Sequence, residues 1–116
     1  MTTVQDLISA AKTEFTCLDA ETSAAKAHKE GVLLIDLREP SEHDAAAVPV
    51  AVHIPRGVLE FKITEACEDK STEILLHCGG GGRASLAAKS LQSLGYQNIS
   101  IVNAKFEDFL AAYNQS

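Results

Sequence analysis

The sequence predicts an α/β fold in which an open, mainly parallel five-stranded sheet is flanked by helices on both faces. Segments with apolar residues at helical spacing alternate with short, continuously apolar segments along the whole chain. The apolar segments at 32–35 and 74–76 do not alternate with polar residues, which is typical of strands buried on both faces of a parallel sheet. The 116 residues, 46% of them hydrophobic, suit one hydrophobic core, so residues 1–116 are predicted to form a single domain.

An apolar stripe indicates the first helix. Val4, Leu7, Ile8, Ala11 and Phe15 recur at intervals of three and four residues, so they fall on one side of a helix. The opposite side is polar, and the helix is therefore predicted to pack with this stripe against the rest of the chain.

The remainder of the chain continues the alternation. A short apolar piece at 15–18 precedes a helix at 20–29, for which Asp19 is a suitable N-cap and Gly31 lies just past the end. The other predicted elements are a strand at 32–37, a short helix capped by Ser41 and ending at 47, a strand at 49–54, a short helix at 56–61, a strand at 74–77, a helix at 83–94 stopped by Gly95, a strand at 99–102 and a final helix that includes 106–113.

Composition excludes several classes of function. The net charge of −6 argues against nucleic acid or an anionic membrane as the main partner. No apolar run reaches the roughly 18 residues of a membrane span, and the acidic, amphipathic first 15 residues do not resemble a signal peptide, so a cytoplasmic protein is expected. Cys17, Cys67 and Cys78 form neither a CxxC pair nor an even set, so neither a disulfide framework nor a structural metal is expected.

The most informative stretch follows the strand at 74–77. Cys78 ends this strand and a helix begins near Arg83. Between them lie only glycines, namely Gly79, Gly80, Gly81 and Gly82. A glycine loop can curl around the sulfur with its N–H groups pointing inward, and the helix N-terminus adds partial positive charge. Such positions favour the thiolate, the nucleophilic form of cysteine, so this loop is a candidate anion cradle with Arg83 as a cation.

Other interpretations remain open for these residues. A cysteine after a strand can be a small buried hydrophobic residue, and a glycine run can be a plain turn. Asp36 and Arg38 also follow a strand end, where ligand sites form in open α/β sheets. For this pair a supporting role is favoured, with Asp36 accepting backbone hydrogen bonds and Arg38 pairing with a carboxylate. His77 is expected to be a hydrogen-bonded core histidine.

Four motifs resemble the rhodanese family of sulfurtransferases in its single-domain form. They occur in the family's order, at 34–40 (LIDLREP), 54–57 (IPRG), 77–88 (HCGGGGRASLAA) and 94–99 (LGYQNI). The resemblance implies that Cys78 takes a sulfur atom from a small anionic donor such as thiosulfate, releasing sulfite. A thiol, a protein or cyanide would then accept that sulfur from the Cys78 persulfide. The resemblance implies no cofactor and no metal, and residues 79–83 would bind the anion.

The chain also departs from the family pattern. Residues 46–51 lack the glycines and histidine usual before the middle strand, and 103–106 lack the family's double glycine. Lys105 in the second segment is either a further cation near the cleft or a solvated side chain. Cys67 is either a second thiol that resolves the persulfide or a plain buried cysteine.

Two other functions compete with sulfur transfer. Dual-specificity phosphatases carry a related loop, H-C-x-x-x-x-x-R, but here four residues rather than five separate Cys78 from Arg83. The shorter loop suits one sulfur atom better than a phosphoryl group. A non-enzymatic persulfide carrier or a rhodanese-like binding module is compatible with the same sequence.

Overall fold

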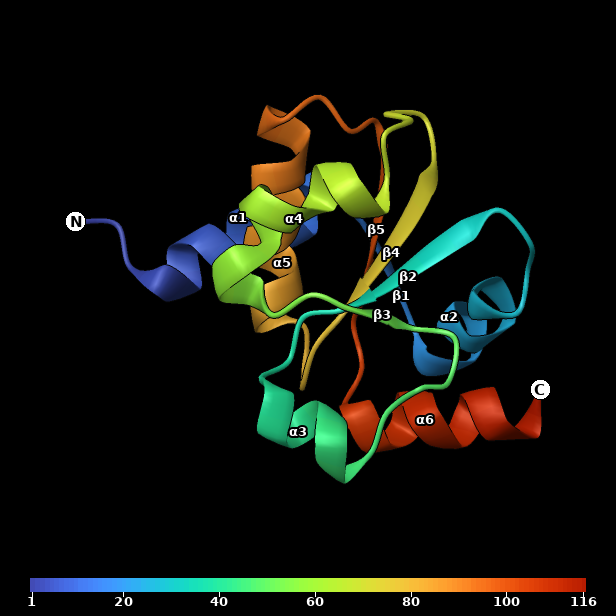
Figure 1. Ribbon diagram of the computed structural model, residues 1–116. Coiled ribbons are helices and arrows are strands. Elements are labelled where there is room, and N and C mark those ends of the chain that lie inside the picture. The colour runs from blue at the N-terminus through green and yellow to red at the C-terminus, as the bar shows by residue number, and fades with distance from the viewer.

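A computed structural model that describes residues 1–116 confirms the predicted α/β fold. Five strands form one entirely parallel sheet in the order β1-β5-β4-β2-β3 (Figure 1). The strands are β1 (Thr16–Leu18), β2 (Val32–Asp36), β3 (Val52–His53), β4 (Glu73–His77) and β5 (Asn98–Val102). Because β4 is the central strand, the loop after it lies between loops that follow its two neighbours.

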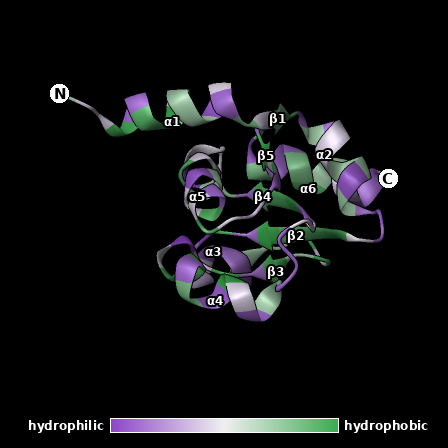
Figure 2. Cartoon of the chain, turned by 90° about the horizontal axis from the view of Figure 1, so that it is seen from above, coloured by the Kyte–Doolittle hydropathy of each residue, from purple (hydrophilic) through white to green (hydrophobic).

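Helices cover both faces of the sheet. They are α1 (Val4–Glu14), α2 (Ala20–Ala27), α3 (Pro40–Ala45), the 3₁₀ helix η1 (Arg56–Val58), α4 (Leu59–Ala66), α5 (Gly82–Ser93) and α6 (Phe106–Gln115). Viewed from above, the strands lie between α5 on one side and α2 and α6 on the other (Figure 2). Helix α1 packs against α5.

Each face of the sheet has its own apolar core. Side chains of α4 and α5 belong to the larger core of 16 buried residues, and those of α2 and α6 to a second core of 8. Successive strand residues alternate between these cores: Leu34 and Leu75 point to the smaller one, while Ile35 and Leu76 point to the larger. The continuous apolar runs in the sequence follow from this burial on both faces.

Two predicted helix ends are observed as expected. The side chain of Asp19 accepts a hydrogen bond from the backbone N–H of Thr22 at 2.8 Å and so caps α2. Gly95 follows α5 with a φ of +97°. The N–H groups of Gly95 and Tyr96 donate to carbonyls of the last turn of α5, which is the Schellman arrangement that a glycine favours.

Several element boundaries differ from the prediction. The short helix expected at 56–61, for example, is the 3₁₀ helix η1 followed by α4, which continues to Ala66. The strand expected at 49–54 is reduced to Val52–His53, because residues 49 and 50 form a turn in which Ala51 N–H donates to the carbonyl of Val48 at 3.0 Å. Helix α3 begins at Pro40 rather than after Ser41, with Glu39 as its N-cap. Proline is favoured at the first helical position because its missing N–H has no partner there.

None of the helices combines the length and the apolar composition that a membrane span requires. The three cysteines are all free thiols.

Candidate active site

The glycine loop joins the central strand to the N-terminus of α5. Gly81 has a φ of +102°, and a Cβ built on it would lie 3.3 Å from Asn103 Oδ1. A Cβ on Gly79 would lie 3.0 Å from Arg83 Nη2, whereas one on Gly80 would meet nothing within 4 Å. Gly81 is thus required by its backbone conformation. A side chain at Gly79 would displace the end of Arg83, while Gly80 lies on the open side of the loop.

The sulfur of Cys78 lies inside this loop and accepts hydrogen bonds from the backbone. The N–H of Gly81 donates to Sγ at 3.2 Å and the N–H of Ala84 at 3.4 Å. Ala84 is the third residue of α5, so Sγ stands where the side chain of an N-cap residue would accept its bond. Only 3% of Cys78 is exposed. Both donors lie at the N-terminus of α5, where the backbone amides of a helix can stabilise an anion.

Further backbone donors surround the sulfur. The N–H groups of Gly79 and Gly80 make no hydrogen bond within the chain. Those of Gly82 and Arg83 belong to the first turn of α5, where no intrahelical acceptor exists. A bound anion could therefore accept bonds from these amides. Of the residues predicted for the cradle, Gly81 donates its backbone N–H to Sγ. Ala84, the second backbone donor, lies outside the predicted set.

Arg83, the predicted cation of the cradle, is paired with a carboxylate in the fold. Its Nη1 and Nη2 donate to the two carboxylate oxygens of Glu42 in α3 at 2.6 and 3.1 Å. The hydrogen bonds from Arg83 hold the pKa of Glu42 at about 2, and those to Glu42 raise the pKa of Arg83. The pair ties α3 to the loop. Spacing could not reveal Glu42, which is 41 residues from its partner.

Asp36 and Arg38 form a second, buried pair at the end of β2. The Arg38 guanidinium donates to both carboxylate oxygens of Asp36, at 3.0 and 2.9 Å. It also donates to the carbonyls of Glu42 and Ala46 and lies 3.7 Å above the ring centre of Phe106. Asp36 is fully buried, which favours a higher pKa, but hydrogen bonds from Arg38 and His43 more than offset burial and hold the pKa of Asp36 at about 2.

This second pair braces the loops around the site. Through Arg38 it joins the end of β2 to the carbonyl of Glu42 within α3 and to that of Ala46 at the C-terminal end of α3. Arg38 also touches Phe106, whose N–H donates to the carbonyl of Gly79 in the glycine loop at 3.1 Å. Neither Asp36 nor Arg38 contacts Sγ. The pair therefore positions α3 and Phe106 beside the glycine loop and makes no contact with the sulfur.

His77 is buried as expected, but the expectation that it is hydrogen-bonded is wrong. Neither ring nitrogen has a hydrogen-bond partner, and Nε2 is 3.9 Å from Asp36 Oδ1. The ring packs against Phe106 and Phe109. Burial lowers the pKa of His77 from 6.5 to about 4, despite the neighbouring carboxylate of Asp36. A neutral imidazole therefore lies directly before Cys78.

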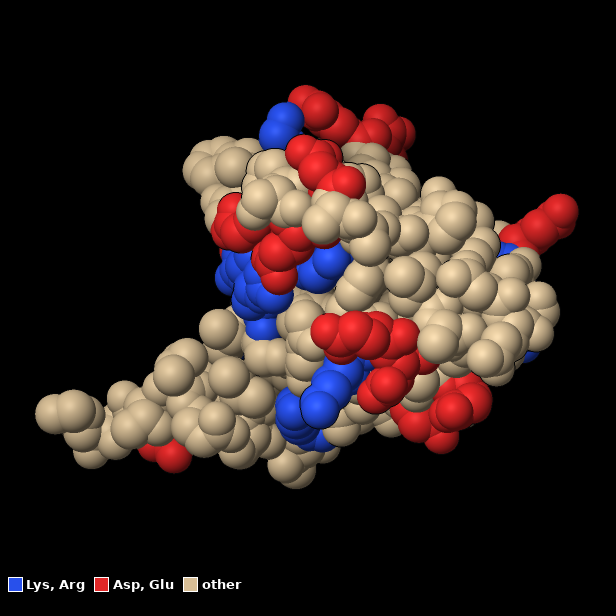
Figure 3. All heavy atoms as spheres, turned by 90° about the horizontal axis from the view of Figure 1, so that it is seen from below, with Lys and Arg blue, Asp and Glu red and all other residues tan.

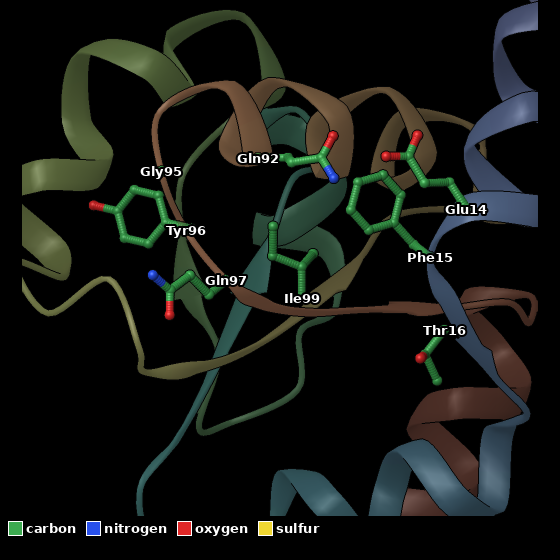
Figure 4. A pocket seen from close by; sticks show the side chains of 8 residues that line it. All are labelled: Glu14, Phe15, Thr16, Gln92, Gly95, Tyr96, Gln97 and Ile99. Carbon is green, nitrogen blue, oxygen red and sulfur yellow. The ribbon is translucent and has the colours of Figure 1, made fainter.

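A pocket elsewhere on the molecule lies apart from these residues. It has a volume of about 530 Å³ and is lined in part by Gln92, Gly95 and Tyr96 (Figure 4). These residues lie at the C-terminal end of α5 and beyond it, whereas the glycine loop adjoins the N-terminal end. None of the predicted site residues lines this pocket, so the candidate site is the loop around Cys78.

Comparisons with known proteins give the family of the chain. The family described as the rhodanese-like domain matches residues 19–112. The chain is 30% identical to a thiosulfate:glutathione sulfurtransferase of Saccharomyces cerevisiae, over 72% of this chain and 68% of the relative. It is also 30% identical to the thiosulfate sulfurtransferase GlpE of Tolumonas auensis, over 86% of this chain and 92% of the relative.

One solved structure shares the fold over almost the whole chain. It is a protein of unknown function from Rhodopseudomonas palustris, described as a possible tyrosine phosphatase. The TM-score is 0.83 with 24% identity, and the match covers 97% of this chain and 92% of the other. At this identity the likeness shows the fold alone. The matched part of the chain includes α1.

Proposed function

Since the chain belongs to the rhodanese-like domain family, we propose that it is a sulfurtransferase in which Cys78 carries the transferred sulfur. The donor is a small anion with a sulfane sulfur, such as thiosulfate, and the acceptor is a thiol, a protein or cyanide. The relatives named thiosulfate sulfurtransferases support this substrate class. Free thiols at all three cysteines suit a reducing compartment, and a cytoplasmic location is part of the proposal.

The proposed reaction has two steps. The Cys78 thiolate attacks the outer sulfur of thiosulfate; a new S–S bond forms, and the donor S–S bond breaks with its electron pair leaving on sulfite. An acceptor thiolate or cyanide then attacks the outer sulfur of the persulfide and regenerates the Cys78 thiolate. The persulfide is itself an anion, so the same backbone donors can stabilise it.

The observation that carries the proposal is the position of Cys78 Sγ. It accepts bonds from the N–H groups of Gly81 and Ala84, while the amides of residues 79, 80, 82 and 83 remain available to an anion. These groups are fixed by the fold before any substrate binds, which reduces the reorganisation needed when negative charge moves onto the sulfur.

Phosphatase chemistry is less well supported. Four residues separate Cys78 from Arg83, one fewer than in the phosphatase loop. In addition, Arg83 is paired with both carboxylate oxygens of Glu42, so its guanidinium could bind a phosphoryl group only by breaking this ion pair. The proposed sulfur transfer relies on the backbone amides of the loop instead.

The test is the intact mass of the purified protein before and after incubation with thiosulfate, beside a Cys78→Ser variant. The proposal predicts a gain of one sulfur atom in the wild type, its loss on addition of cyanide, and no gain in Cys78→Ser. Cys67→Ser is a matched control, since Cys67 is also buried, and it should gain sulfur normally.

The outcomes separate the competing functions. Persulfide formation followed by turnover with thiols establishes an enzyme. Persulfide that small acceptors cannot remove supports a carrier that serves a protein partner. Failure of thiosulfate and of other persulfide donors, with Cys78 reduced, would refute sulfur transfer at this site.

A further inference from the structure

Helix α1 places a lysine beside the glycine loop, although it precedes the residues that match the family. A Cβ on Gly82 would lie 3.5 Å from Ile8 Cδ1, and one on Gly81 would lie 3.6 Å from Lys12 Nζ. Gly81 also donates to Cys78 Sγ. With one covalent bond length each for Cβ–Cα and Cα–N of Gly81, the ammonium lies no more than about 10 Å from the sulfur.

Lys12 differs from Arg83 in having no anionic partner. Its ammonium forms no ion pair and no hydrogen bond within the chain, and the side chain is partly exposed. The charge of Arg83 is matched by the carboxylate of Glu42. The positive charge of Lys12 is therefore not paired with a carboxylate of the chain. Figure 3 shows the face of the molecule on the side of α3 and α6, where Lys and Arg side chains gather near the middle and acidic side chains lie beside them.

We propose that Lys12 binds the charged end of the sulfur donor, such as the sulfonate oxygens of thiosulfate, and so favours doubly charged donors over singly charged ones. This inference rests on the proposed function of Cys78. Lys12 would also stabilise sulfite as it leaves with the electron pair of the broken S–S bond. Coulomb attraction is proportional to the charge of the donor, so a dianion gains about twice the interaction energy of a monoanion.

The first experiment compares two donors that deliver the same sulfur atom. Thiosulfate is a dianion and releases sulfite, whereas methanethiosulfonate is a monoanion and releases methanesulfinate. The rate constant for persulfide formation on Cys78 is measured with each donor. Lys12→Gln should lower it about fivefold for thiosulfate and about twofold for methanethiosulfonate, in keeping with the charge ratio. Lys12→Arg should retain the preference of the wild type.

A matched control removes the same charge elsewhere. Lys29 is exposed, follows α2 and precedes β2, so it lies at the end of the sheet opposite the glycine loop. Lys29→Gln should leave both rate constants within about 1.5-fold of the wild type, because exposed charges separated by more than a Debye length are largely screened.

The second experiment does not depend on sulfur transfer. Alkylation of Cys78 is followed by peptide mass spectrometry with iodoacetate, an anion, and iodoacetamide, which is neutral. In each case the thiolate forms a C–S bond and iodide leaves. Lys12→Gln should lower the ratio of the iodoacetate rate to the iodoacetamide rate at least twofold, and Lys29→Gln should leave it unchanged.

The two experiments distinguish failure of this inference from failure of the proposed function. An unchanged alkylation ratio in Lys12→Gln, or an equal effect on both donors, overturns the role of Lys12 even if the wild type forms persulfide. If the wild type forms no persulfide with either donor, the proposed function fails and the donor-binding role with it. The alkylation ratio then reports separately whether Lys12 attracts anions to Cys78.

Discussion

Replacing His77 with leucine should make the fold less sensitive to acid. Both nitrogens of His77 are buried without partners, and burial lowers its pKa in the fold from 6.5 to about 4. An unfolded chain binds a proton at this residue below pH 6.5, whereas the folded chain does so only near pH 4. The contribution of His77 to the free energy of unfolding is therefore fully present above pH 6.5 and is lost as the pH falls from 6.5 to 4.

The size of this loss follows from the shift in pKa. One pKa unit corresponds to about 1.4 kcal/mol, so the full effect is roughly 3 kcal/mol, of which about 2 kcal/mol is lost between pH 7 and pH 4.5. Asp36 and Glu42 have pKa values of about 2 in the fold. Their contribution is lost chiefly below pH 4.5, so this window isolates the histidine.

The assay is urea unfolding followed by far-UV circular dichroism at pH 7 and pH 4.5. His77→Leu keeps an apolar side chain of similar volume between Phe106 and Phe109 and removes the titrating ring. The difference in unfolding free energy between the two pH values should be about 2 kcal/mol smaller in this variant than in the wild type. His28→Gln, which replaces an exposed histidine, should keep the wild-type difference. If His77→Leu also keeps that difference, the reasoning about burial is refuted.

Two further predictions concern the loop and the buried ion pair. Gly81→Ala should lower the unfolding free energy by about 1–2 kcal/mol, because an L-residue is strained at positive φ and the new Cβ would approach Asn103. Gly57→Ala, where a Cβ meets nothing within 4 Å, should lower the unfolding free energy less in the same urea titration. Equal losses in the two variants would contradict the role of positive φ. Asp36→Asn should lower the unfolding free energy by roughly 3–5 kcal/mol, because it leaves the buried Arg38 guanidinium without its carboxylate. Thermal unfolding beside the exposed-site control Asp44→Asn measures this, and a loss below about 1 kcal/mol would show that Arg38 finds other partners.

The fold class could be predicted because its signals are local and repeated. The continuous apolar runs at 32–35 and 74–76 belong to strands that face two cores, and the caps at Asp19 and Gly95 involve residues within a few positions of each other. The strand predicted at 49–54 is longer than the observed β3 because Pro49, which has no N–H to donate to a ladder, lies in a turn.

The sequence by itself determined the parallel sheet and the candidate nucleophile, since Cys78, its glycines and the start of α5 are contiguous and fix one another's geometry through short-range backbone bonds. Only the tertiary structure decided which charges surround the sulfur. Glu42 neutralises Arg83 from 41 residues away, Lys12 reaches Gly81 from α1, and His77 loses all hydrogen-bond partners on burial. Such pairings depend on where distant elements pack, and no spacing along the chain records the distance between two side chains brought together by folding.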